Sequence, residues 1–185
     1  RMLYFRSIGQ NCYIGYETGA NSISKDILEK GLMKDFETFL NKAQIKCKLK
    51  EIEINGQKSI AFDFGKKSVE FFSIASTGTQ SLSLLYYWLQ RMKIKNEVSF
   101  VFIDEFDAYY HHELSKLVVE EMKKGNYQTV LTTHNTSIMS NDILRPDCYF
   151  IMSKNDIKPL YDFTDKELRL AHNIEKMYRA GAFDG

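Results

Sequence analysis

The feature that most constrains the fold is a short apolar run that ends in two adjacent acids. Residues 99–105 read Ser-Phe-Val-Phe-Ile-Asp-Glu. A continuous apolar run of this length is typical of a strand buried on both faces, as in a parallel sheet. The carboxyl end of such a strand opens into the crevice where α/β proteins bind ligands. Because buried carboxylates are costly without a cation or donors, Asp104 and Glu105 are candidate site residues; the alternative is that they simply begin a polar loop.

The patterning elsewhere predicts an α/β chain in two parts. Residues 2–24 show no clean period, whereas Asn55-Gly56 is a strong hairpin signal. We expect helices over 31–43, 79–92, 112–123 and 165–179, a short helix after Asn135-Thr136, and strands over 47–54, 58–64, 68–72, 98–103, 128–132 and 148–152. The alternation of strands and helices after residue 98 predicts a parallel sheet. We therefore divide the chain into a helix and antiparallel β region, 1–67, and an α/β part, 68–185.

Composition narrows the class of protein. The 185 residues are 44% hydrophobic, enough for a compact core, and the formal net charge of +1 gives no global field that favours nucleic acid or membrane. No apolar stretch is long enough to span a bilayer, no signal peptide is visible, and the three cysteines lie far apart without metal-ligand spacing. We expect a cytoplasmic protein with reduced thiols. Because the chain begins with arginine, we interpret it as part of a longer protein.

Two further segments lie on either side of the acidic pair in the sequence. Ser76-Thr77-Gly78-Thr79 leads into a helical pattern, and a serine hydroxyl with a glycine amide at a helix start can bind an anion. Val130-Leu131-Thr132-Thr133 is a β-branched run that ends in His134, so this histidine is expected at the same sheet edge as the acids. Each has a plainer alternative, since Ser/Thr/Gly clusters are common in loops and a histidine at such a turn often serves as a cap.

In this order the three segments resemble the signature loop, the Walker B segment and the switch histidine of the ABC-type ATPase superfamily. The likeness spans roughly residues 68–183 and is nearest to bacterial AAA-like ATP-binding proteins of the overcoming-lysogenization and chromosome-maintenance branch. It implies the C-terminal part of an ABC-type P-loop ATPase head, in which parallel strands with flanking helices accompany a small antiparallel β/helix region. Asp104 would hold Mg²⁺ through water, Glu105 would polarise the attacking water, and His134 would sense the γ-phosphate of ATP.

The same resemblance implies a homodimer closed around ATP. In such dimers Ser76, Gly78 and Thr79 would meet the γ-phosphate held by the opposite subunit. Thr77 and Thr79 depart from the commonest form of this loop, in which a glycine and a glutamine occupy these positions. Asp107 falls in the loop that crosses the dimer interface, although a helix-capping role for it is an equal alternative.

The phosphate-binding loop of this superfamily, Walker A, cannot be found in the chain. Such a loop needs spaced glycines followed by lysine and Ser/Thr, and the one Gly-Lys pair, Gly65-Lys66, lacks both the upstream glycine and the hydroxyl. We read Gly65-Lys66-Lys67 as a turn. The isolated chain is therefore expected to bind ATP weakly without turnover, and the working ATPase is expected to need an N-terminal Walker A segment of the same protein.

Two functions from different classes follow. The first is the C-terminal portion of an ABC-type ATPase, for which the resemblance implies DNA maintenance or anti-phage defence beside an effector protein such as a nuclease. The second is a non-catalytic interaction or regulatory module with an ATPase-like shape, so enzymatic activity stays open. Nucleic acid could bind lysines 42, 46, 48 and 50, but Glu51 and Glu53 follow directly and favour a solvated charged face. No membrane partner is expected.

Overall fold

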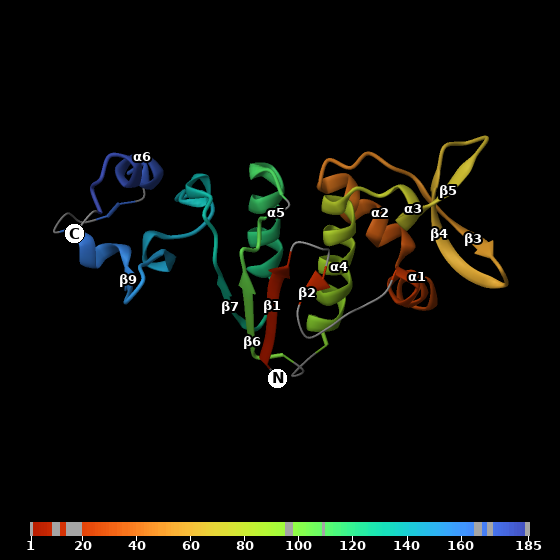
Figure 1. Cartoon of the computed structure of the whole chain (residues 1–185), viewed down its shortest axis with the longest axis horizontal. Helices are drawn as coiled ribbons and strands as arrows, with labels where there is room; N and C mark the ends of the chain where they lie inside the picture. The colour runs from red at the N-terminus through yellow and green to blue at the C-terminus, as the bar shows by residue number, and fades with distance from the viewer. Residues whose placement is uncertain are drawn as a thin grey trace.

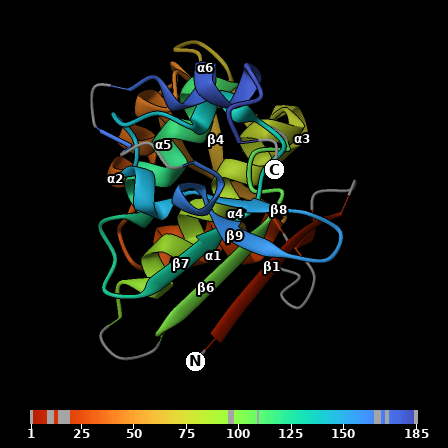
Figure 2. The same ribbon diagram turned by 90° about the vertical axis from the view of Figure 1, so that its left-hand side faces the viewer.

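The computed structural model describes residues 2–8, 12–13, 20–94, 98–108, 110–164, 168–169 and 172–183. Its central sheet has the order β2-β1-β6-β7. The strands β1 (Met2–Ile8), β6 (Phe100–Asp104) and β7 (Gln128–Leu131) are parallel, and β2 (Cys12–Tyr13) adds an antiparallel edge. Figure 2 shows β1, β6 and β7 side by side, running in one direction. The predicted α/β class with a parallel sheet is thus confirmed.

β1 was not expected, because residues 2–24 show no clean period. It pairs with β6 from Met2↔Phe100 through Arg6↔Asp104, so the acidic end of β6 lies opposite Arg6 in the register. Pairing between segments almost a hundred residues apart supplies what the local pattern lacks.

Two long helices accompany the sheet. α4 (Thr77–Met92) and α5 (His112–Met122) stand beside β1 and β6 in Figure 1. α4 is buried on nearly all sides, as its all-round apolar pattern predicts, because α1 and α2 pack on it and its leucines also join Val101 and Ile103 of β6 in one core. In Figure 1, α4 begins at the same end of the molecule to which β6 points.

The second part of this core comes from a small antiparallel lobe. α1 (Ala20–Glu29) and α2 (Met33–Lys42) precede the sheet β3 (Leu49–Ile54), β4 (Gln57–Asp63) and β5 (Ser68–Glu70), which has the order β3-β4-β5. The hairpin predicted at Asn55-Gly56 is confirmed, with φ of 50° and 78° at the two turn residues. β5 ends earlier than expected because α3 (Phe71–Ile74) begins there, where the Glu70 carboxylate accepts a hydrogen bond from the Ser73 amide. β5 pairs with β4 across the predicted boundary between residues 1–67 and 68–185. The division of the chain at that boundary stays a prediction.

The C-terminal part corrects two expectations. The strand predicted over 148–152 was assigned to the parallel sheet, and this was wrong: β8 (Phe150–Met152) pairs antiparallel with β9 (Ile157–Pro159) in a separate hairpin. The Ser153 amide donates to the Asp156 carbonyl at 2.8 Å, and closing this short turn costs less conformational entropy than pairing with a distant strand.

The last helix is also shorter than the predicted 165–179. Within the described residues of this stretch it covers α6 (Ile174–Arg179) alone, while 165–167 and 170–171 lie outside them. The Asn141 amide donates to the carbonyls of Arg169 and His172, and the Asn173 side chain caps the Lys176 amide, so the helix begins after these residues.

In the part of the chain that the structure describes, the remaining helices are three short 3₁₀ turns: η1 (Thr136–Ile138), η2 (Pro146–Cys148) and η3 (Leu160–Phe163). The first confirms the short helix expected after Asn135-Thr136. A small second core, centred on Tyr149, Leu160, Ile174 and Phe183, holds this part together. Within the described chain, no helix has the length and apolarity required to span a bilayer.

Candidate functional site at the sheet edge

The two acids lie at the carboxyl end of β6, as predicted. Asp104 is the last residue of the strand, and Glu105 follows with φ of 45°, a left-handed conformation that a residue with a side chain adopts at a cost. β6 and β7 remain in register up to Ile103↔Leu131, so the residues immediately after both strands emerge together. The half-buried Asp104 and the exposed Glu105 are thereby set against the segment that carries His134.

The structure brings His134 beside Glu105. The Nε2 atom of His134 lies 3.7 Å from Oε1 of Glu105, and the two side chains are 92% and 51% exposed. This separation exceeds hydrogen-bond length, so the pair is open to solvent and to a ligand rather than locked together. An acid that can polarise water and an imidazole that can donate to an anion thus share one edge of the sheet.

Asp107 belongs to the same edge but caps no helix. Its Oδ1 accepts a hydrogen bond of 2.6 Å from the Thr133 hydroxyl, and its Oδ2 is buried without a hydrogen-bond partner in the described part of the chain. α5 begins only at His112, so the helix-capping alternative is wrong for this residue. The carboxylate instead ties the loop after β6 to the loop after β7.

The Ser76 loop forms the start of α4. The Ser76 hydroxyl accepts from the Thr79 amide at 3.3 Å and lies 3.0 Å from the Thr79 hydroxyl, so Thr79 is engaged in the cap and is nearly buried. Gly78 lies in the first turn and is half-buried, and the exposed Ser76 remains accessible. Within the described residues, no hydrogen bond joins Ser76 or Thr79 to the acids or to His134.

The donor set suits a magnesium ion held partly by a substrate. No group of three or more His, Cys, Asp or Glu able to hold a metal occurs among the described residues. Mg²⁺ usually takes one or two carboxylates and leaves its other positions to water and substrate phosphates. Asp104, whose Oδ1 already accepts from the Thr132 hydroxyl, therefore fits such an ion as a single carboxylate ligand, directly or through water.

Sequence reasoning missed the two threonines between β7 and His134. The Thr132 hydroxyl accepts from the Glu105 amide at 2.8 Å and donates to Oδ1 of Asp104 at 2.6 Å, and Thr133 binds Asp107. The sequence carries no signal that separates these two threonines from ordinary residues of a β-branched run. His112 is exposed, and its Nδ1 lies 3.0 Å from the Ser137 hydroxyl.

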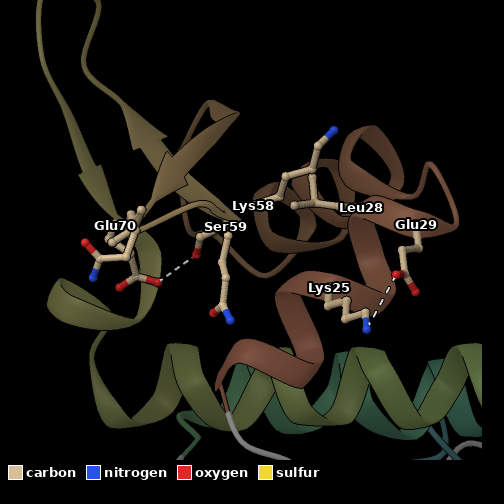
Figure 3. Close-up of a pocket in the computed structure, with 9 residues that line it drawn as sticks. Lys25, Leu28, Glu29, Lys58, Ser59 and Glu70 are labelled. Carbon is tan, nitrogen blue, oxygen red and sulfur yellow. Dashed lines mark hydrogen bonds and ion pairs between the residues drawn. The ribbon is translucent and has the colours of Figure 1, made fainter.

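Other expectations concern the antiparallel lobe. The Gly65-Lys66 segment is a turn, as predicted, with φ of 80° at Gly65 and a hydrogen bond from the Phe64 amide to the Lys67 carbonyl. An open hollow of about 810 Å³ lies between α1 and the β3–β4 hairpin (Figure 3). There the Glu70 carboxylate accepts from the Ser59 hydroxyl and Lys25 pairs with Glu29. None of the candidate site residues lines this hollow.

Parallel strands with flanking helices and an acidic pair at the sheet edge are the arrangement that the motifs predicted for an ATPase-type α/β domain. A comparison with family models agrees: residues 18–140 match the family described as "AAA domain, putative AbiEii toxin, Type IV TA system". This match covers more than half of the chain, so the protein belongs to that AAA family. The resemblance to ABC-type and AAA-like ATPases drawn from the motifs is thus confirmed. Among curated proteins, none matches.

Solved structures with similarity include two Smc head domains and an SMC ATPase. The Smc head domain of Pyrococcus furiosus, with an extended coiled coil and bound to the C-terminal domain of ScpA, is 16% identical with a TM-score of 0.41, covering 60% of this chain and 30% of that one. The Smc head of Pyrococcus yayanosii with a coiled coil and joint is 21% identical with a TM-score of 0.42, covering 62% and 24%. A third, from "Structural biochemistry of ATP-driven dimerization and DNA stimulated activation of SMC ATPases", is 14% identical with a TM-score of 0.48, covering 84% and 96%. This chain thus spans less than a third of the length of each of the two Pyrococcus Smc head chains.

Proposed function

We propose that this chain is the C-terminal portion of an ATPase that hydrolyses ATP with Mg²⁺. The observation that carries the proposal is the juxtaposition of Asp104, Glu105 and His134 at the carboxyl edge of the parallel sheet. The family supports ATP with Mg²⁺ as the ligand. When bound, the metal neutralises charge on the phosphates during in-line attack.

Each residue then has one task. Asp104 orients the metal through its carboxylate. Glu105, half exposed beside His134, accepts a hydrogen bond from the attacking water and polarises it. The imidazole of His134 donates to an oxygen of the γ-phosphate and so stabilises charge that grows in the transition state.

Other parts of the active assembly lie on neighbouring segments. β7 is the last strand of the described sheet and Val130 on it is 36% exposed, which leaves an edge at which a further strand can add. We propose that an N-terminal Walker A segment of the same protein supplies the phosphate-binding loop there. Ser76, Gly78 and Thr79 would complete the site of a second subunit, with Asp107 at the interface, so that ATP holds a homodimer together. We further propose that such a dimer acts in DNA maintenance or phage defence, beside an effector such as a nuclease, as the motif resemblance implies.

The test compares this chain, the longer protein that carries the phosphate-binding loop, and Glu105→Gln in that longer protein. We expect turnover in the longer protein and none in the isolated chain. Glu105→Gln should retain ATP binding, stabilise the dimer and lose at least about 100-fold in kcat, because an amide cannot accept the proton. Glu53→Gln, an exposed acid on β3, serves as the matched control and should turn over normally.

Two results would count against the proposal. Unchanged turnover in Glu105→Gln removes this residue from its role. Absence of turnover in every preparation favours the second candidate, a non-catalytic interaction or regulatory module, which is consistent with the high exposure of Glu105 and His134.

A further inference from the structure

One side chain, that of Thr132, connects both acids of the site. Its Oγ1 accepts a hydrogen bond from the Glu105 amide at 2.8 Å and lies 2.6 Å from Oδ1 of Asp104. A hydroxyl has a single proton, and the amide already uses the oxygen as an acceptor. That proton is donated to Oδ1 of Asp104.

The main chain of Thr132 binds the same loop. Its amide donates to the Ile103 carbonyl at 3.0 Å, and its carbonyl accepts from the Phe106 amide at 3.1 Å. All three polar groups of this one residue thus engage four consecutive residues, 103–106. These hydrogen bonds stabilise a strained position, because Glu105 has φ of 45°. A residue with a side chain keeps this left-handed conformation only when its surroundings hold it there.

The neighbouring threonine differs in a useful way. The Thr133 hydroxyl donates to Asp107 at 2.6 Å and accepts from the Asn135 amide at 2.9 Å. It contacts neither Asp104 nor Glu105 within the described hydrogen bonds. Substitutions of the two threonines therefore test two different contacts. A change at Thr132 affects the acidic pair, and a change at Thr133 affects the loop that carries Asp107.

We propose that Thr132 is a positioning residue of the ATPase reaction. Its hydroxyl sets the direction of the Asp104 carboxylate and the backbone of Glu105 relative to His134, which follows two residues later on the same segment. The inference rests on the proposed function, since it assigns a role within that site. A hydroxyl at this position ties the Asp104 carboxylate and the Glu105 backbone to the segment that carries His134.

The test uses Thr132→Val, which replaces the hydroxyl with a methyl group at nearly constant volume, and Thr132→Ser, which restores it. In the longer protein, Thr132→Val should lower kcat by about 10- to 100-fold with little change in KM for ATP, as expected for displaced catalytic groups. Thr132→Ser should recover most of the rate. Thr133→Val is the matched control and should not change the exchange of the Glu105 amide.

A second readout does not depend on activity. Amide hydrogen exchange of Glu105, measured on this chain, should accelerate on the order of 10-fold in Thr132→Val and return toward the wild-type rate in Thr132→Ser. The inference fails if Thr132→Val keeps the wild-type kcat, or if Thr132→Ser is as slow as Thr132→Val. It also fails if the exchange of the Glu105 amide does not change. If the wild-type longer protein has no turnover, the proposed function itself is refuted. The Thr132 variants test the positioning role alone.

Discussion

The aromatic cluster at Phe71 joins the antiparallel lobe to the loop that carries Ser76. Phe71 is fully buried, and its ring centroid lies 4.7 Å from that of Phe62, 5.0 Å from that of Phe72 and 5.5 Å from that of Phe36. Truncating a buried phenylalanine to alanine usually costs about 3–5 kcal/mol, and each aromatic pair adds about 0.5–1.5 kcal/mol beyond area burial. We therefore expect Phe71→Ala to lower the free energy of unfolding by about 4–5 kcal/mol.

The matched control is Phe64→Ala, since Phe64 is 63% exposed and its ring centroid lies 6.3 Å from that of Phe62, its one ring neighbour among the described residues. This variant should lose at most about 1 kcal/mol. Urea denaturation followed by far-UV circular dichroism gives both values. If Phe71→Ala does not fold, Phe71→Leu should fold with a loss of about 1–2 kcal/mol, because fewer buried carbon atoms are removed. Losses for Phe71→Ala and Phe64→Ala within about 0.5 kcal/mol of each other would refute the burial argument.

Two further predictions concern ionisable groups. Burial, with a smaller effect of Glu37, raises the pKa of the Cys47 thiol to about 11, whereas Cys148 is exposed. A maleimide at pH 8 should therefore label Cys148 at least about 10-fold faster than Cys47 by peptide mass spectrometry, and equal rates would contradict this. The hydrogen bonds that Glu37 accepts from Lys34 and from the Leu49 amide hold its pKa below the ordinary value of 4.5. A lowered folded-state pKa stabilises the protein above that value and the contribution is lost as pH falls, so Glu37→Gln should be less stable than wild type at pH 7. The difference should shrink at pH 3.5, and a constant difference would show that ionisation of Glu37 does not matter.

The edge site was largely predictable because its signals are local. Each of two patterns predicts a strand and identifies the side chains at its carboxyl end. The first is an apolar run followed by two acids, and the second is a β-branched run followed by His134. Parallel strands place both ends at one edge, and the pairing of β6 with β7 then brings Glu105 and His134 to 3.7 Å. The role of Thr132 was not predictable in the same way, because a threonine in a β-branched run has an ordinary reason to be there.

The wrong or missed secondary-structure predictions lie where contacts with other segments outweigh the local sequence pattern. β1 has no readable periodicity and becomes a strand by pairing with β6. The segment 148–152 looks like another parallel strand, yet its nearest partner is the hairpin strand β9. The stretch before α6 has helical spacing, but Asn141 binds the carbonyls of Arg169 and His172 that a helix would need.

The sequence by itself determined the α/β class, the hairpin at Asn55-Gly56 and the residues at the end of β6, since these depend on spacing and residue type along a few turns of chain. The tertiary structure alone decided which strands pair and how the acids are held. The left-handed backbone at Glu105 persists because Thr132, 27 residues away, binds its amide. Such a contact depends on the register of two strands, and register is a property of the folded sheet rather than of either segment.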